Sequence, residues 1–279
     1  MGRRDAYKVK DIHGVQNILI DFKPHRCDSA VYMNRKIDMT NFVKFIKKKK
    51  KEIDGLTYYH GIVDVIAKAM YSRPYLNRFI ANRTMYMHKD VSLAQTIKVE
   101  FEDNSIEMLM VIKVDSEDTL LDISRKTKEK VDTIREKRLE GKGNANGAAD
   151  TIGKLPKFLR VPIIGTLKWL DKHGKLPKSL TDDNLYYSSA ILSNLGTFKV
   201  GAIYHNLTNF GTASSLITFG EIYEENGKWY MEMGATIDER IADGFYFCKA
   251  LKLIEYIFDT PELMLEPAGK KVEIPEDRK

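Results

Sequence analysis

The residues best suited to chemistry in this chain lie in the segment 235–245. Asp238, Glu239 and Asp243 are clustered there beside Arg240, and the pattern predicts a strand that passes through a turn directly into a helix. Turns of this kind commonly hold functional side chains, and the glycine after Asp243 adds backbone freedom where the helix begins. Taken alone, the segment favours a structural interpretation, in which an Asp near a helix N-terminus lies beside a surface ion pair.

Two motifs elsewhere in the chain change that interpretation. Residues 191–196 read Ile-Leu-Ser-Asn-Leu-Gly, and His25-Arg26 precedes Ile-Asp-Met-Thr at 37–40. The segment 238–245 resembles the Asp-His-Arg-x-x-Asp-Gly signature of dihydrolipoyl acyltransferases, and 191–196 resembles their Ile-Ser-Asn-Leu-Gly strand. Residues 25–40 are similar to the amino-terminal entry of chloramphenicol acetyltransferases. The chain is therefore interpreted as a relative of this acyltransferase superfamily.

The resemblance implies a role for each matching residue. Ser193 would donate a hydrogen bond to the tetrahedral oxyanion of acyl transfer. Arg26 and Asp243 would form the buried ion pair that, in the family, fixes the turn bearing the catalytic residue. Glu239 stands where the family has the histidine that removes the proton of the attacking thiol or hydroxyl.

Glutamate at position 239 is a chemical departure from the family. A glutamate with a pKa near 4.3 lies about four units below a thiol near 8.5, so full proton transfer is uphill by roughly 6 kcal/mol. Burial in an apolar channel can raise a carboxyl pKa enough to remove most of that difference. An active Glu239 must therefore be desolvated, and the alternative is a degenerate site in which Glu239 pairs with Arg240 or with a nearby lysine.

The histidines offer a substitute base and no metal site. His205 follows the Ser193 strand closely enough to approach the site, although a structural role fits it as well. His60 is expected to be packed in the core. The other histidines have no spacing that suggests metal ligation, so we expect no metal. They are His13, His88 and His173.

Composition limits the classes of partner. The chain has 279 residues, 43% of them hydrophobic, and a net charge of +6. This modest charge suits an anionic ligand such as CoA, and the absence of a basic stripe interleaved with aromatic residues argues against nucleic acid. Cys27 and Cys248 form neither a disulfide framework nor a metal motif. Without an apolar leader or spanning segment, the protein is expected to be cytoplasmic.

Hydrophobic periodicity predicts an alternation of strands and helices. The lysine run 47–51 is expected to lie on a solvated helix surface, or to contact a phosphate of CoA. Asn226-Gly227 predicts a hairpin. Strands are expected at 28–38, 84–88, 91–101, 106–114, 187–193, 214–223 and 229–237, and helices from 40, at 58–70, at 118–139 and at 243–258.

Residues 141–180 are expected to form an insertion without a family counterpart. Residues 141–149 are rich in turn formers and predict a flexible loop. Residues 154–180 alternate apolar clusters with cations. Such a stretch either forms short helices that close over the domain or a partner subunit, or lies on a membrane surface as a peripheral contact.

These observations lead to one overall hypothesis. Residues 1–279 form a single acyltransferase-like α/β domain of the chloramphenicol acetyltransferase type, with a mostly antiparallel mixed sheet flanked by helices. The resemblance implies a homotrimer or larger oligomer with the active site between subunits. The expected activity transfers an acyl group between CoA and an unidentified thiol or hydroxyl acceptor, which is a small molecule or a lipoyl group. No lipoyl domain, peripheral-subunit-binding domain or covalent lipoyl group is expected on this chain.

The alternative hypothesis starts from the missing histidine. A catalytically degenerate relative would use the same core as a structural or scaffold subunit, and it too could lie at a membrane surface through residues 154–180. The sequence identifies neither the acyl group nor the acceptor.

Overall fold

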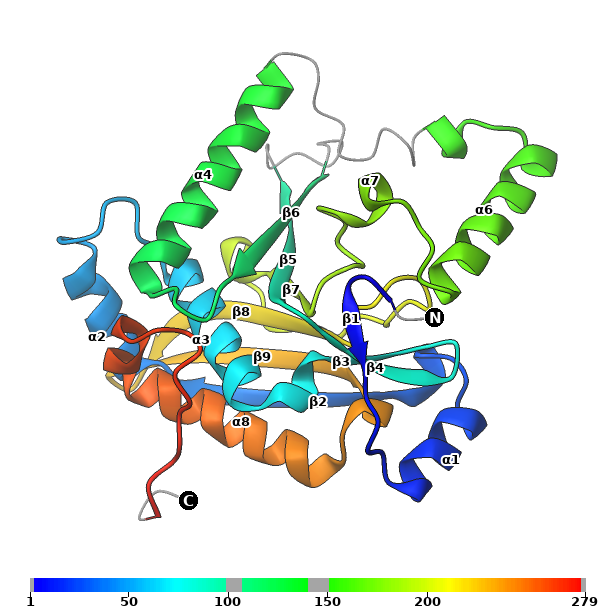
Figure 1. The fold of residues 1–279 in the computed structure, drawn as a ribbon. Helices are drawn as coiled ribbons and strands as arrows, with labels where there is room; N and C mark the ends of the chain where they lie inside the picture. The colour runs from blue at the N-terminus through cyan, green and yellow to red at the C-terminus, as the bar shows by residue number, and fades with distance from the viewer. Residues whose placement is uncertain (1–2, 99–106, 140–150, 277–279) are drawn as a thin grey trace.

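A computed structural model describes residues 3–98, 107–139 and 151–276. Two sheets and a layer of helices make up this part of the chain (Figure 1). The strands are β1 (Ala6–Lys8), β2 (Ala30–Asp38), β3 (Arg78–Ala81), β4 (Thr84–His88), β5 (Val91–Lys98), β6 (Glu107–Val114), β7 (Ala190–Asn194), β8 (Ser215–Glu225) and β9 (Lys228–Asp238). The α-helices are α1 (Gly14–Phe22), α2 (Thr40–Lys49), α3 (Tyr58–Ser72), α4 (Leu120–Leu139), α6 (Lys157–Lys172), α7 (Lys178–Thr181) and α8 (Gly244–Asp259).

The larger sheet is mixed and has the order β2-β9-β8-β7-β5-β6. β7 runs parallel to both of its neighbours, β5 and β8, whereas the other three pairings are antiparallel. The predicted mostly antiparallel mixed sheet flanked by helices is therefore confirmed. β7, β8 and β9 are inner strands of this sheet, and they position two of the predicted site residues. Ser193 lies on β7, and Glu239 follows the end of β9.

The hairpin between β8 and β9 turns where the sequence predicts it. Asn226 and Gly227 have φ angles of 53° and 77°, and Glu225 pairs with Lys228 on either side of them. Positive φ at both central residues gives the turn the twist that matches two antiparallel strands, and asparagine and glycine adopt it at little cost. The Asn-Gly prediction is confirmed.

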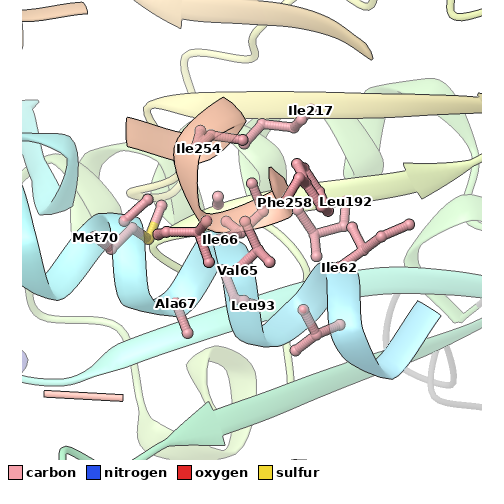
Figure 2. Close-up of a cluster of buried hydrophobic side chains, with 14 of the residues drawn as sticks. Ile62, Val65, Ile66, Ala67, Met70, Leu93, Leu192, Ile217, Ile254 and Phe258 are labelled. Atoms are coloured by element: carbon pink, nitrogen blue, oxygen red, sulfur yellow. The ribbon is translucent and has the colours of Figure 1, made fainter. Parts of the chain in front are cut away.

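One face of the large sheet is covered by α3 and α8, which lie side by side against it in Figure 1. α3 is buried along most of its length, as its all-round apolar sequence predicts. Figure 2 shows Ile62, Ile66 and Met70 of α3 among side chains from the strands and from α8. The resulting core gathers Leu93 of β5, Leu192 of β7, Ile217 of β8, and Ile254 and Phe258 of α8.

The described part of the insertion includes α6 and the start of α7. α6 lies apart from the helical layer in Figure 1, and most of its apolar side chains are exposed, whereas Leu167 and Leu170 are partly buried. The exposed ones are Phe158, Leu159, Val161, Ile163, Ile164 and Trp169. No helix in the described part of the chain is both long and apolar enough to span a bilayer. The predicted loop at 141–149 lies outside the described residues.

The hydrophobic pattern does not predict β1, β3 or α1. β1 and β3 flank the predicted β4 in a separate three-stranded antiparallel sheet, and α1 precedes β2. β1 and β3 have only three and four residues, too few to show a period. α1 buries only Ile20, so it lacks a recognisable apolar face. These small elements matter because α1 contacts the predicted site.

Asp64 of α3 is a carboxylate in the core. It is fully buried, and neither of its oxygens has a hydrogen-bond partner among the described residues. Burial raises the pKa of Asp64 well above its usual value of 3.8, although Lys68 one turn along the helix acts in the opposite direction. The folded protein therefore holds this proton more tightly than the unfolded chain. As a result, the free energy of unfolding falls as the pH rises from about 4 toward the folded-state pKa.

Asp64→Asn is expected to stabilise the protein, and more so at higher pH. An amide of the same shape needs no proton, so the gain should grow above pH 4 by at most about 1.4 kcal/mol per pH unit. Urea unfolding of both proteins at pH 5 and pH 8 measures the gain, with Asp132→Asn, on the exposed side of α4, as the control. An equal gain at both pH values would contradict this account of Asp64.

Candidate functional site

The turn that bears Glu239 is formed where β9 ends. Asp238 is the last residue of β9, Glu239–Ile241 form one 3₁₀ turn, and α8 begins at Gly244. The Asp238 carboxylate accepts a hydrogen bond from the backbone N–H of Arg240 at 3.1 Å. The local sequence thus folds the turn through its own first carboxylate.

A buried cluster of charges fixes this turn. Arg240 and Asp238 are almost inaccessible to solvent and form a two-pronged ion pair, with Nε to Oδ1 at 2.8 Å and Nη2 to Oδ2 at 2.7 Å. Arg26 places its Nε 3.8 Å from Asp238 Oδ2 and donates to the carbonyls of Thr208 and Gly211 at 2.6 and 3.1 Å. Burial lowers the pKa of Arg26, and the nearby Asp238 opposes that shift. Two guanidiniums therefore share one buried carboxylate.

The ion pair predicted between Arg26 and Asp243 is wrong. Asp243 is exposed and caps α8, where its Oδ1 accepts from the N–H of Tyr246 at 2.7 Å. Arg26 instead has Asp238 as its partner. The reason is the position of the two carboxylates: Asp238 ends a central strand that pairs with Ala30 of β2, four residues after Arg26, whereas Asp243 has already reached the surface.

Glu239 forms an ion pair with a lysine. Lys23 Nζ donates to Glu239 Oε1, and the two side chains are 38% and 31% exposed. Two hydrogen bonds hold α1 and Lys23 against the turn. Gln16 of α1 donates to the Arg240 carbonyl at 2.7 Å, and the Arg240 side chain donates to the Lys23 carbonyl at 2.8 Å. Within this chain Glu239 is therefore not desolvated. Its charge is balanced by Lys23, which matches the alternative, drawn from the sequence, that Glu239 pairs with a nearby lysine.

Ser193 lies on β7 with an available hydroxyl. Its side chain is half-buried, and its Oγ makes no hydrogen bond within the described residues. The neighbouring Leu192 belongs to the core beneath α3 and α8, so the alternation of a strand places Ser193 on the opposite face of the sheet. Ser193 is in register with Thr218, whose hydroxyl donates to the Ile203 carbonyl at 2.5 Å. Ser193 thus shares a sheet face with the connection around Ile203.

Ser193 and Glu239 do not meet within one chain. The register runs from Ser193 to Thr218 to Gly234, and Asp238, just before Glu239, is four residues further along β9. That distance is about 14 Å along the strands, in addition to two strand spacings of about 4.8 Å. A site that uses both side chains needs them from two different copies of the chain.

His205 lies in the connection between β7 and β8. Its Nε2 is buried without a hydrogen-bond partner among the described residues, and it bonds with neither Ser193 nor Glu239. The adjacent Tyr204 packs edge-to-face against Tyr32 of β2.

By contrast, His60 is buried and hydrogen-bonded to Ser124 Oγ at 3.0 Å, which confirms its predicted core position. Burial lowers the pKa of His60 to about 4.

A cavity of about 500 Å³ adjoins the turn. Arg26 and Arg240 line it, together with cations from α6 and from the β3–β4 turn. Its lining suits an anionic group rather than a metal. Among the described residues, no three His, Cys, Asp or Glu side chains gather closely enough to hold a metal ion.

Sequence reasoning misses several residues of this site. Gln16 belongs to α1, Lys23 lies just beyond its end, and Asp171 comes from α6 of the insertion. Each is separated from the turn by a long stretch of chain and belongs to no motif. Arg240 is the exception, since it lies inside the signature segment 238–245. Its role is to pair with Asp238 in the interior and so to hold the turn.

Comparison with known proteins by sequence gives no match, either to a family model or to a curated protein. Comparison of structures does. Chloramphenicol acetyltransferase aligns with a TM-score of 0.61 at 12% identity, over 91% of this chain and 99% of the other. A truncated catalytic core of the 2-oxoacid dehydrogenase multienzyme complex from Thermoplasma acidophilum aligns with a TM-score of 0.57 at 17% identity, over 91% and 99%. A probable dihydrolipoamide acetyltransferase from Listeria monocytogenes gives 0.55 at 17%, over 91% and 95%. The chain therefore has the fold shared by chloramphenicol acetyltransferase and the dihydrolipoamide acetyltransferase cores.

Proposed function

We propose that the protein is a CoA-dependent acyltransferase whose site is completed between two copies of the chain. One copy contributes Glu239 and the next contributes Ser193, each at the position that the resemblance assigns to a catalytic group. The oligomer follows from this requirement, and the expected assembly is a trimer. The acceptor is a small thiol or alcohol, or a lipoyl group carried by another protein.

The observation that carries the proposal is the way in which the Glu239 turn is built. Asp238, Arg240 and Arg26 are buried charges, and taking charges out of water is costly unless their geometry is well matched. A turn needed only to connect a strand to a helix requires no such cluster. Here the cluster fixes the backbone on both sides of one partly exposed carboxylate, beside a cavity. Such rigid support is what a reactive side chain needs.

The proposed reaction is acyl exchange at a thioester. Glu239 takes the proton of the acceptor thiol, and the sulfur attacks the carbonyl carbon of acyl-CoA. The resulting oxyanion accepts a hydrogen bond from the Ser193 hydroxyl of the neighbouring copy. Collapse of the tetrahedral intermediate expels the CoA thiolate, which recovers the proton from Glu239.

The Lys23 pair sets a condition on this step. The Lys23 ammonium group donates to one oxygen of the Glu239 carboxylate, so Lys23 has to move away before the acceptor thiol can approach that oxygen. Lys23 lies just beyond the end of α1 and is more than a third exposed, which leaves it room to move. Binding of substrate between two copies is the event expected to break the pair.

Turnover of a CoA panel tests the proposal. The protein is incubated with acetyl-, propionyl-, butyryl- and longer acyl-CoA together with dihydrolipoamide, and thioesters are followed by mass spectrometry. Consumption of at least one acyl-CoA with acylation of the acceptor is expected. The degenerate-scaffold alternative, which the Lys23–Glu239 pair favours, requires that no thioester be consumed by the oligomer.

A second proposed property concerns α6, which fits an anionic membrane surface. Its exposed apolar side chains include Phe158, Ile163 and Trp169, and its charges are mostly cationic. The cations are Lys157, Arg160, Lys168 and Lys172, and the single acid, Asp171, is bonded to the body of the protein. An amphipathic helix with a basic polar side binds best to anionic lipid.

Removing the two exposed aromatic side chains of α6 is expected to weaken lipid binding. Phe158→Ser/Trp169→Ser should lower the partition into phosphatidylglycerol vesicles about tenfold or more, measured by sedimentation. Phe22→Ser, which removes from α1 an aromatic side chain at least as exposed as Phe158 and Trp169, is the control. If the double variant changes the oligomer mass and leaves sedimentation unaltered, α6 packs on another copy and the membrane contact is wrong.

A further inference from the structure

The cavity beside the Glu239 turn has an unusual charge. Its volume is about 500 Å³, and among its lining residues cations outnumber acids. The cations are Arg26, Arg83, Lys168, Lys172 and Arg240, and the one acid is Asp171. Arg26 and Arg240 share the Asp238 carboxylate, and Arg83 lies 3.6 Å from Asp21, so the excess positive charge among the described residues belongs to Lys168 and Lys172. Such an excess of positive charge in a concave site concentrates anions.

The single acid of the lining is not available to neutralise these cations. Asp171 is buried, and its carboxylate accepts hydrogen bonds from the Tyr187 hydroxyl and, at 3.0 Å, from the N–H of Gly211. Its carbonyl accepts from Arg3 at 3.2 Å. Asp171 therefore anchors the end of α6 to the body of the protein.

This anchor determines where two lysines lie. Lys168 and Lys172 are one turn apart on α6, so they share one face of the helix, and both line the cavity. Neither forms an ion pair with any described residue. The insertion thus supplies to the cavity that adjoins the turn two exposed ammonium groups that have no acidic partner in the described part of the chain.

Arg26 also lines the cavity, but it is already paired. Its side chain is only 3% exposed, its Nε lies 3.8 Å from Asp238 Oδ2, and its Nη atoms donate to the carbonyls of Thr208 and Gly211. The cationic groups left to bind a ligand in the cavity are therefore those of α6.

We propose that this cavity is a phosphate subsite, in which Lys168 and Lys172 of α6 bind the phosphate groups of a phosphorylated ligand. The inference deepens the proposed function, on which it rests for the view that the cavity and Glu239 belong to one site. The phosphate arises from either of two sources, the pyrophosphate of a CoA thioester or a separate phosphorylated molecule. The insertion then serves to select the ligand, a task that the fold alone does not give it.

The test compares two pairs of lysines on the same segment. Inorganic pyrophosphate and CoA are titrated by calorimetry into the wild-type protein, Lys168→Ala/Lys172→Ala and Lys154→Ala/Lys157→Ala. The second double variant removes the same charge from residues that do not line the cavity, and all four lysines are exposed. The first double variant should weaken pyrophosphate binding about tenfold, and the control less than about twofold.

Four outcomes are decisive for the subsite. Equal weakening by both double variants would mean a diffuse charge effect, and no binding of pyrophosphate by the wild-type protein would mean no subsite; either overturns the inference. Parallel losses for pyrophosphate and CoA identify CoA as the source of the phosphate. A loss for pyrophosphate in a protein that does not bind CoA supports the subsite and assigns it to another phosphorylated ligand.

Activity separates this inference from the proposed function. If Glu239→Gln leaves acyl-CoA turnover unchanged while Lys168→Ala/Lys172→Ala weakens phosphate binding, the catalytic proposal fails and the subsite stands. If Glu239→Gln abolishes turnover while both double variants bind pyrophosphate equally, the catalytic proposal stands and the subsite fails.

Discussion

Asp238→Ala is expected to lower the free energy of unfolding by about 3–5 kcal/mol, the range measured when one partner of a buried ion pair is removed. The substitution leaves both Arg26 and Arg240 buried without a counterion within 4 Å among the described residues. It also removes the carboxylate that accepts from the Arg240 backbone. Urea unfolding at fixed protein concentration measures the loss, since any oligomer makes the stability depend on concentration.

Asp243→Ala is the matched control for Asp238→Ala. Asp243 belongs to the same turn, but its carboxylate only caps α8. Loss of an N-cap costs about 1 kcal/mol. If Asp243→Ala destabilised the protein as much as Asp238→Ala, the ion pair of Arg26 with Asp238 would not be the main support of the turn, and its assignment to Asp238 would be wrong.

Glu239→Gln is expected to reduce acyl-CoA turnover by a factor of about 10² to 10⁴, the usual contribution of a general base. The amide has nearly the same shape and remains beside Lys23, but it cannot accept a proton. KM for acyl-CoA should change little, because Glu239 acts on the acceptor. Steady-state kinetics with dihydrolipoamide as the acceptor provide both constants.

Glu255→Gln provides the control for this activity measurement. Glu255 is 28% exposed and pairs with Arg35, which resembles the 31% exposure of Glu239 and its pair with Lys23. It should retain wild-type turnover. An inactive wild-type protein that gains activity in Glu239→His would instead support the scaffold alternative, because the fold would then be competent and only the base would be missing.

The sequence predicts the large sheet and its helices because each has a clear period. α2 begins at Thr40 and β4 spans Thr84–His88, as the pattern indicates. β5 and β6 follow the predicted strands as far as the described residues extend. Ser193 and Glu239 are placed on β7 and at the end of β9 because their motifs are local to a strand and its turn.

The parts that could not be predicted depend on contacts between distant residues. Asp238 and Asp243 are two carboxylates of one motif, and the sequence does not reveal which of them is buried. That depends on the pairing of β9 with β2, which brings Arg26 to Asp238. Lys23 likewise reaches Glu239 only because α1 packs against the turn, and so the partner of the carboxylate could be described only as a nearby lysine.

Mixing two inactive variants tests the central claim, that Glu239 and Ser193 act together from different copies of the chain. Glu239→Gln and Ser193→Ala are each unfolded and refolded alone, and then together. In random mixed trimers, about one quarter of the interfaces join an intact Glu239 to an intact Ser193, because the interface is built from two different surfaces. We predict recovery of about that fraction of wild-type turnover. Mixed oligomers, verified by mass, that remain as inactive as either variant would contradict the claim.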